Sequence, residues 1–292
     1  MKQSLLISIC LLITYATSTA QQHAGQSEVK TDTIHSEILK ADRAYTIYLP
    51  KSYDTQAQRK YPILYLLHGL SGMNSNWFDK ASVKQVQDQL VASGESVEMI
   101  IVSPNAGGNP ETEWNGYFDM PGWNYEQFFF SELLPHIEST YRVIGDKQNR
   151  AVAGLSMGGG GSAAYGQKHA DTFGSVYAMS ALMAIPADRP IPQNQPAPSK
   201  RQLLTKSVIE NSCVDYVNNA SEAQKEQLRT VKWFVDCGDD DFLLDTNIDF
   251  LRAMRAAKIP LEFRIRDGGH DWLYWHSALY TCLPFVSRNF QP

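Results

Sequence analysis

The segment Asn149–Ser162, NRAVAGLSMGGGGS, contains the residues best suited to do chemistry. Gly154 and Gly158 lie two residues either side of Ser156, in a G-x-S-x-G pattern between a short apolar run and a stretch of small residues. This pattern is typical of a strand, a sharp turn and a helix, with an exposed nucleophilic serine at the turn. A phosphate-binding loop is disfavoured, because no Lys follows the glycines and their spacing is not G-x-G-x-x-G. We therefore predict that Ser156 is a nucleophile.

A serine hydroxyl is a weak nucleophile at neutral pH, so the chemistry needs a base and a carboxylate that orients the base. In an open parallel sheet, such groups lie just beyond the C-terminal ends of strands. His270 follows the last predicted strand, after Gly268 and Gly269, and is the preferred base. His276, one turn into the predicted closing helix, is the alternative.

Three adjacent carboxylates, Asp239, Asp240 and Asp241, follow the penultimate predicted strand. Asp241 precedes an apolar pair and is the one expected to point inward, while Asp239 and Asp240 remain alternatives. The resulting order of serine, acid and histidine along the chain is that of the α/β-hydrolases, and it differs from the order in other serine-protease folds.

The elements that position these residues are predicted from apolar runs and helical periodicity. Buried strands are predicted at Tyr61–Leu67, Met99–Ser103 and Ala151–Ala153, after an edge hairpin over Ile34–Leu49, and further strands are predicted at Ser175–Met179, Lys232–Cys237 and Leu261–Ile265. Helices are predicted at Ser82–Val91, Tyr125–Tyr141, Ile248–Lys258 and Leu273–Phe285. This alternation predicts an α/β fold with a mainly parallel central sheet and helices on both faces.

One domain is expected over residues 34–292, after a flexible lead-in at 21–33. A Pro-rich excursion at about 184–229 interrupts the alternation, with polar helical segments in its second part. The aromatic, Gly-rich segment Asn105–Asn124 is predicted to be a long functional loop.

The 292 residues are 43% hydrophobic and 20% charged, with a net charge of -5. This composition contains no basic stripe, so nucleic acid is not an expected partner. Met1–Ala20 has the basic start, apolar middle and small-residue end of a secretory signal peptide. No second long apolar run follows, so we expect an exported protein, periplasmic or extracellular, with no membrane span.

Three cysteines remain after cleavage at Ala20: Cys213, Cys237 and Cys282. They are too few and too scattered for a disulfide framework or a zinc site, although one bridge is possible in an oxidising compartment. We expect most of them to be buried apolar residues, and we expect no metal and no cofactor.

The chain resembles the esterase D-like branch of the α/β-hydrolases. Members of this branch include the feruloyl and acetyl xylan esterases of carbohydrate esterase family 1, tributyrin-type esterases and mycolyltransferases. The matching segments are Leu67–Gly69, Glu132–Glu138 with Tyr141 and Arg142, Gly154–Gly159, Cys237 and Gly238 with Asp241, and Gly268–Trp272. They span most of the chain from Tyr61 onward, and their joint order is more specific than any one of them.

The resemblance implies that Ser156, Asp241 and His270 form a catalytic triad. It also implies an oxyanion hole made by the backbone N–H groups of Leu70 and Met157. The second of these donors follows independently from the serine turn, whose next residue usually supplies an N–H. His68 is expected to shape the oxyanion loop rather than to transfer protons.

The predicted function is that of a secreted serine ester hydrolase that works through an acyl-enzyme and removes acetyl or feruloyl-type groups from carbohydrate. The substrate would be a small-molecule or polysaccharide ester, and Trp114, Trp123 and Trp272 are candidate residues for stacking on it. Two alternatives are an acyltransferase to a sugar acceptor and a non-catalytic carbohydrate-binding protein on a hydrolase scaffold. The predicted signal disfavours a cytosolic thioesterase acting on S-formylglutathione.

Overall fold

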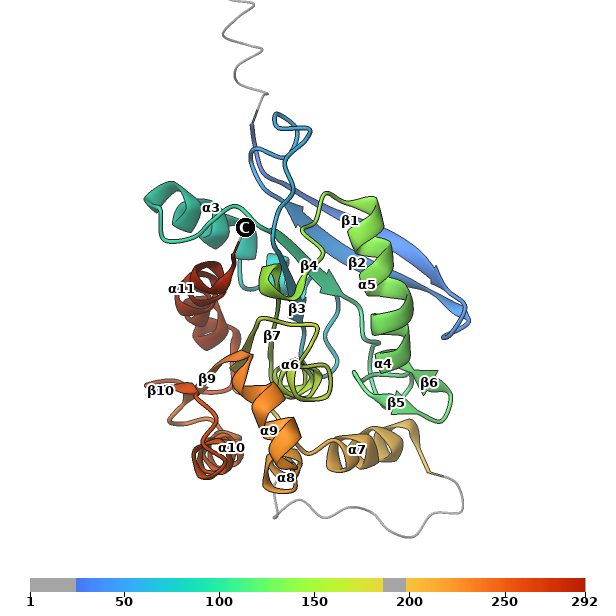
Figure 1. Cartoon of the computed structure of the whole chain (residues 1–292). Coiled ribbons are helices and arrows are strands. Elements are labelled where there is room, and N and C mark those ends of the chain that lie inside the picture. Colours follow the sequence, from blue (N-terminus) through green and yellow to red (C-terminus); the bar gives the residue numbers. More distant parts are fainter. Residues whose placement is uncertain (1–24, 186–197, 292) are drawn as a thin grey trace, which may run out of the picture.

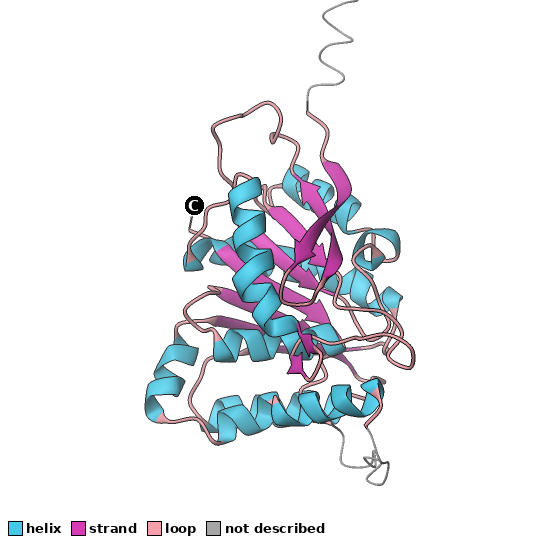
Figure 2. Ribbon diagram, turned by 90° about the vertical axis from the view of Figure 1, so that its right-hand side faces the viewer, coloured by secondary structure: helices cyan, strands magenta, loops and turns pink. Residues whose placement is uncertain are grey.

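A twisted sheet crosses the middle of the protein, and helices pack on both of its faces (Figures 1 and 2). This computed structural model describes residues 25–185 and 198–291. The predicted signal peptide, residues 1–20, and most of the prolines of the predicted excursion lie outside the described residues.

Within the described residues, eight strands form the sheet in the order β1-β2-β4-β3-β7-β8-β9-β10. The strands are β1 (Glu28–Ser36), β2 (Ala41–Leu49), β3 (Ile63–Leu67), β4 (Ile100–Pro104), β7 (Arg150–Leu155), β8 (Ser175–Met179), β9 (Lys232–Gly238) and β10 (Glu262–Arg266). β2 pairs antiparallel with β1 and β4, and every other neighbouring pair is parallel. The predicted fold class, a mainly parallel α/β sheet, is confirmed.

Residues of the central strands alternate between two hydrophobic cores, one on each face of the sheet. In β3, for example, Ile63, Tyr65 and Leu67 face one core, while Leu64 and Leu66 face the other. Strands buried on both faces read as continuous apolar runs, which is why the sequence identified them.

The helices divide between these two faces. The first core is covered by α4 (Tyr125–Phe128), α5 (Leu134–Thr140), α6 (Met157–Lys168), α7 (Lys200–Glu210), α8 (Cys213–Asn218), α9 (Glu222–Arg229) and α10 (Leu244–Ala256). The second core is covered by α2 (Asn76–Asp79), α3 (Val83–Ser93) and α11 (Trp272–Asn289). The two-residue strands β5 (Asp119–Met120) and β6 (Trp123–Asn124) form a small separate hairpin, so the end of the predicted loop Asn105–Asn124 is ordered.

The first strand begins earlier than the sequence predicted. Glu28 to Thr33 belong to β1 and pair with β2, so the predicted flexible lead-in at 21–33 is wrong over these residues. β1 is an edge strand whose first six residues are exposed or half-buried, so the alternating apolar signal of a strand is absent there.

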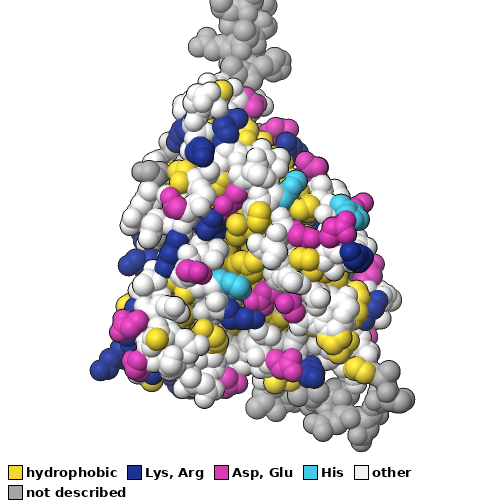
Figure 3. All heavy atoms as spheres, turned by 45° about the vertical axis from the view of Figure 1, so that its right-hand side comes forward, with side chains coloured by type: hydrophobic (Ala, Val, Ile, Leu, Met, Phe, Trp, Pro, Cys, Tyr) yellow, Lys and Arg dark blue, Asp and Glu magenta, His cyan; other side chains and the backbone are white. Residues whose placement is uncertain are grey.

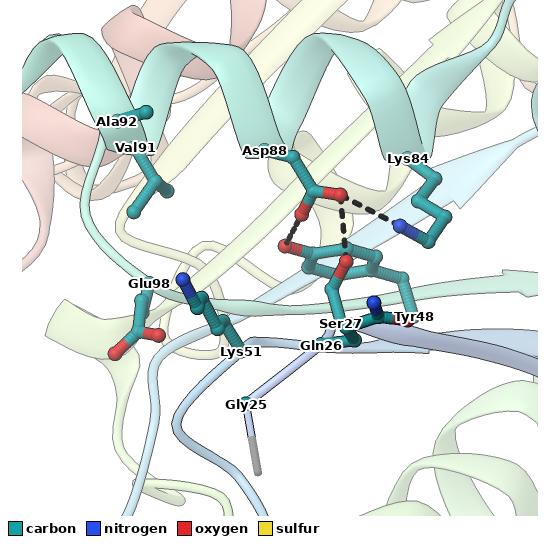
Figure 4. A pocket seen from close by; sticks show the side chains of 10 residues that line it. All are labelled: Gly25, Gln26, Ser27, Tyr48, Lys51, Lys84, Asp88, Val91, Ala92 and Glu98. Carbon is teal, nitrogen blue, oxygen red and sulfur yellow. Dashed lines mark hydrogen bonds and ion pairs between the residues drawn. The ribbon is translucent and has the colours of Figure 1, made fainter. Parts of the chain in front are cut away.

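Asp88 on α3 holds the start of this strand in place. Its carboxylate accepts hydrogen bonds from the Ser27 hydroxyl at 2.6 Å, the Tyr48 hydroxyl at 2.8 Å and the Lys84 ammonium at 2.7 Å. Figure 4 shows these three groups converging on the carboxylate in a pocket of about 360 Å³. The hydrogen bonds of the Asp88 carboxylate connect α3 to β2 and to Ser27, the residue before β1.

The helix predicted over Tyr125–Tyr141 is present, but it is not regular. A π-helical turn at Phe129–Leu133 separates α4 from α5. Pro135 in the first turn of α5 lacks an N–H and its ring crowds the carbonyl one turn earlier, so the regular i to i-4 pattern is interrupted.

The second part of the predicted excursion consists of α7, α8 and α9. Capping boxes start α7 at Ser199 and α9 at Ser221, where each serine accepts an N–H and a Gln three residues later reaches back. α8 packs against α6 and α10, so this part of the excursion lies against the body of the domain.

The surface is mixed in charge. On the face drawn in Figure 3, acidic and basic side chains are interspersed, with small groups of apolar side chains exposed between them. None of the helices in the described residues is both long enough and apolar enough to cross a bilayer.

Candidate active site

Ser156 sits at a strained turn between β7 and α6. Its φ of 54° and ψ of -120° lie where an L-residue is rarely found, and it occupies the N-cap position of α6 without a capping hydrogen bond from its side chain. Its N–H donates to the Met179 carbonyl of β8 at 2.9 Å, which fixes the turn to the neighbouring strand. A Cβ on Gly158 would lie 2.5 Å from the His68 carbonyl, so only glycine allows α6 to approach β3 this closely.

His270 and Asp241 lie beside this serine in one hydrogen-bonded line. His270 Nε2 is 2.9 Å from Ser156 Oγ, and His270 Nδ1 is 2.9 and 3.0 Å from the two oxygens of Asp241. An ionised carboxylate only accepts, so Nδ1 carries the proton and Nε2 of the neutral ring accepts from the serine hydroxyl. This arrangement can take a proton from Ser156 when its oxygen attacks.

The carboxylate of Asp241 is held in its charged form. Burial of this side chain opposes ionisation, but hydrogen bonds from His270, the Leu243 N–H and Ser180 outweigh it and hold the pKa below its usual value. The Leu243 N–H lies 2.9 Å from Asp241 Oδ1. A charged carboxylate at this position can stabilise a positively charged imidazole.

The alternatives from the sequence lie elsewhere. Asp239 and Asp240 are exposed beside Asp267, and Asp239 accepts the Gly268 N–H at 3.0 Å, which shapes the loop before His270. His276 Nδ1 is 2.7 Å from the Ala81 carbonyl, so this imidazole joins α11 to the turn before α3.

The loop after β3 lies against the serine turn. A Cβ on Gly69 would be 2.7 Å from the Leu155 side chain and 3.5 Å from Ser156 Cβ, so the backbone passes close to the nucleophile. Among the hydrogen bonds between described residues, none uses the N–H of Leu70 or of Met157 as donor. Their role as an oxyanion hole stays a prediction.

His68 shapes that loop from inside the protein. Its Nδ1 is 2.9 Å from the Gly69 carbonyl, and its Nε2 accepts the Ala106 N–H at 3.0 Å, so Nδ1 carries the proton. The Tyr117 hydroxyl also donates to the His68 carbonyl at 2.9 Å. Complete burial lowers the pKa of His68 to about 4, so the ring is neutral near pH 7.

Sequence reasoning missed the polar groups beneath the site. Asp236, fully buried near the end of β9, accepts from the hydroxyls of Tyr177 and Tyr274 and pairs with Arg264 of β10. This group joins β8, β9, β10 and α11; the Asp241 loop follows β9, and the His270 loop connects β10 to α11. A buried aspartate at the end of a strand looks the same in sequence as a solvated turn residue, and only its partners from other elements distinguish the two.

Ser180, just after β8, is a second residue that sequence reasoning missed. It has a φ of 44°, its side chain contributes to the low pKa of Asp241, and it accepts the Trp275 indole N–H at 3.1 Å. The Trp275 ring in turn packs edge-on against His270 with centroids 5.0 Å apart. Trp275 is therefore buried support for the imidazole.

The three tryptophans suggested for substrate stacking differ in exposure. Trp123 is buried, with its indole N–H on the Gly116 carbonyl and its ring stacked between Trp114 and Tyr125. Trp114 and Trp272 are partly buried, and Trp272 packs edge-on against Trp77 and Trp275. Trp123 has little face left for a ligand, and a stacking role for the other two stays a prediction.

The three cysteines of the described residues, Cys213, Cys237 and Cys282, are buried and free, so none forms the bridge that the sequence permitted. Burial raises the pKa of the Cys213 thiol to about 12 and raises those of the other two as well. They act as small apolar residues of the core.

Comparison with known proteins identifies the family. A family profile described as "Putative esterase" matches residues 36–286, which is most of the chain. The chain belongs to this esterase family. The esterase is 25% identical over 271 residues to an acetyl esterase from Caldicellulosiruptor saccharolyticus, and the match covers 87% of this chain and 96% of the relative.

A second relative is an endo-1,4-beta-xylanase/feruloyl esterase from Xylanibacter ruminicola. It is 25% identical over 259 residues, which cover 87% of the esterase but 31% of that longer protein. Among solved structures, a ferulic acid esterase is 63% identical with a TM-score of 0.88, and the match covers 91% of this chain and 100% of that one. A Staphylococcus aureus serine hydrolase at 20% identity and a TM-score of 0.73 shares the fold.

These matches confirm the predicted resemblance and the predicted reaction class. The esterase is a carboxylic ester hydrolase with an α/β-hydrolase fold. Its relatives include acetyl and feruloyl esterases, the two kinds that the sequence motifs indicated.

Proposed function

We propose that the esterase is a secreted serine hydrolase that removes acetyl or feruloyl-type groups from carbohydrate through an acyl-enzyme. The observation that carries the proposal is the hydrogen-bonded line from Asp241 through His270 to Ser156. Names of relatives support the acyl groups, since one is an acetyl esterase and another a ferulic acid esterase. The predicted signal peptide supports export.

In the proposed mechanism, Ser156 Oγ attacks the ester carbonyl carbon while His270 Nε2 takes the hydroxyl proton. The carbonyl electrons move onto the oxygen, which is stabilised by the N–H groups of Leu70 and Met157. When this tetrahedral intermediate collapses, the bond to the alcohol breaks and His270 gives its proton to the leaving oxygen. Water then repeats the cycle on the acyl-enzyme and releases the acid.

Each proposed role has a physical basis. Ser156 Oγ lies 2.9 Å from His270 Nε2, and the N-terminus of α6 favours negative charge beside Ser156. Asp241 fixes the tautomer of His270. Removing one oxyanion donor typically lowers kcat by about 100-fold to 1000-fold.

The test is a panel of nitrophenyl acetate, nitrophenyl butyrate and methyl ferulate, assayed with wild type and Ser156→Ala. We expect the variant to lose at least about a thousandfold in kcat while keeping its melting temperature. Intact-protein mass spectrometry with a slow ester should show one added acyl group on wild type and none on Ser156→Ala. Equal activity of the two proteins would exclude Ser156 as the nucleophile.

A further inference from the structure

Apolar side chains are exposed next to residues of the proposed site. Phe242, which directly follows Asp241, is 54% exposed, and Leu70 and Met73 of the loop after β3 are 40% and 50% exposed. Large apolar side chains are usually buried, so their presence on the loops of a site favours contact with a ligand.

Phe242 differs from the other two because it packs on the imidazole. Its ring centroid lies 4.5 Å from that of His270, with an interplanar angle of 47°. Trp275 packs on the same imidazole at 5.0 Å, but Trp275 is 6% exposed and its N–H is held by Ser180. Of these two aromatic rings beside His270, Phe242 is the one that presents a surface to solvent.

The chemistry of the proposed reaction determines which part of a substrate meets that surface. His270 Nε2 must give its proton to the leaving oxygen, so the alcohol part of the ester lies beside the imidazole. The acyl carbonyl oxygen is directed instead toward the N–H groups of Leu70 and Met157. A ring that flanks the imidazole therefore contacts the alcohol and not the acyl group.

We propose that Phe242 determines specificity for the alcohol and that this alcohol is a sugar whose ring packs on the solvent-exposed part of the Phe242 side chain. This inference rests on the proposed function of the same site. An aromatic face carries partial negative charge, and the C–H groups of a sugar ring carry partial positive charge, so the two surfaces attract. A methyl or ethyl alcohol is too small to cover the ring.

The experiment compares two esters of one acid that differ only in the alcohol. Methyl ferulate is paired with feruloyl arabinose, and ethyl acetate is paired with acetylated xylose. Phe242→Ala should lower kcat/KM for the sugar ester by about threefold to tenfold, mainly through KM, because the contact is present before and during the reaction. For the simple ester of each pair, kcat/KM should change less than about twofold. Phe242→Tyr should restore the preference for the sugar ester over the simple ester.

Leu273→Ala is the matched control, because Leu273 is also an exposed apolar residue close to His270 in sequence, at 79% exposure. It removes apolar surface without removing a ring from the imidazole, so both esters should react as with wild type. Melting temperatures of all variants check that the fold is kept.

Two results would overturn the inference while leaving the proposed function in place. If Phe242→Ala lowers kcat/KM equally for both esters of a pair, Phe242 only positions His270. If Phe242→Ala leaves kcat/KM for the sugar ester unchanged, the sugar does not contact this ring. If wild type cleaves neither ester of either pair, the proposed function fails together with the inference, and that outcome is recognised without any variant.

Discussion

Asp241 is the residue of the site whose charge is most firmly set by its neighbours. Its side chain is fully shielded from solvent and is held by His270, Leu243 and Ser180, which keep its pKa low in spite of burial. Asp240, one residue earlier, is exposed. Substitutions at the two positions therefore separate the proposed role of the Asp241 carboxylate from the effect of any negative charge nearby.

Replacing Asp241 by Asn should lower kcat by up to about ten-thousandfold, because the amide would favour the wrong tautomer of His270. The kcat on nitrophenyl acetate is the measurement, with Asp240→Asn as the control. Asp240→Asn should retain most of its activity. A larger loss of kcat in Asp240→Asn than in Asp241→Asn would show that Asp241 does not orient His270.

His68 makes stability depend on pH. Burial lowers its pKa to about 4 in the folded state, while an unfolded histidine titrates near about 6.5. Between these values the unfolded chain binds a proton that the folded protein does not. The stabilisation from a neutral His68 is therefore complete above about pH 6.5 and is lost as the pH falls toward 4, by about 3 kcal/mol in all.

The comparison of wild type with His68→Gln isolates this effect. The variant should be less stable at pH 7, since it loses hydrogen bonds, but the difference in free energy of unfolding should narrow by about 3 kcal/mol between pH 7 and pH 4. Urea unfolding at several pH values measures it. If the free energies of unfolding of the two proteins vary with pH in parallel, His68 does not take up a proton on unfolding in this range.

Much of the site was predictable at this scale. Ser156 and His270 are marked by local pattern, namely the flanking glycines of the serine turn and the paired glycines after a strand. Asp241 is marked only by the apolar residues that follow it. Asp236 and Ser180 carry no local mark, because their partners Tyr177, Tyr274 and Trp275 come from elements that meet only in the folded chain.

At the scale of elements, the loops that carry Asp241 and His270 depend on the packing of β9, β10 and α11. Asp236 belongs to β9 and accepts hydrogen bonds from Arg264 of β10 and Tyr274 of α11. Removing its charge leaves Arg264 without its carboxylate and leaves two tyrosine hydroxyls with a weaker acceptor.

Asp236→Asn should therefore lower the free energy of unfolding by about 3 kcal/mol at pH 7. Urea unfolding gives the value, and an unchanged m-value would show that the unfolded state is not altered. Asp249→Asn is the control, because Asp249 pairs with Arg252 on the exposed face of α10 and should contribute little. Similar losses at the two positions would contradict a special role for Asp236.

The elements themselves were predicted with unequal success. The central strands read as mainly apolar runs, since both of their faces are buried, and the structure has a strand at each predicted place. The start of β1 and the π-helical turn before α5 were not predicted. The start of β1 depends on Asp88, and the π-helical turn depends on Pro135 inside an otherwise helical pattern. Hydrophobic periodicity shows neither effect.

At the scale of the whole molecule, the earlier start of β1 sets how much of the N-terminus the domain needs. A chain that begins at Gln21, as cleavage after Ala20 would leave, keeps all of β1 and Ser27. A chain that begins at Ile34 loses six residues of the β1–β2 ladder and the hydrogen bond from Ser27 to Asp88.

We expect the chain from Gln21 to retain the melting temperature and the activity on nitrophenyl acetate of the protein isolated after export. The chain from Ile34 should melt several degrees lower, because backbone hydrogen bonds of β2 lose their partners. Differential scanning calorimetry compares the two. Equal melting temperatures would show that the β1 residues before Ile34 do not contribute to stability.

The three thiols have a consequence for how the protein is made and stored. Cys213, Cys237 and Cys282 are unpaired within the core, so folding of the described domain requires no oxidation step. Reductants in the medium leave its covalent structure unchanged, and production inside a reducing host compartment should give the same fold as export. The thiols also meet alkylating reagents only when the core opens, so their rate of modification reports how often this happens.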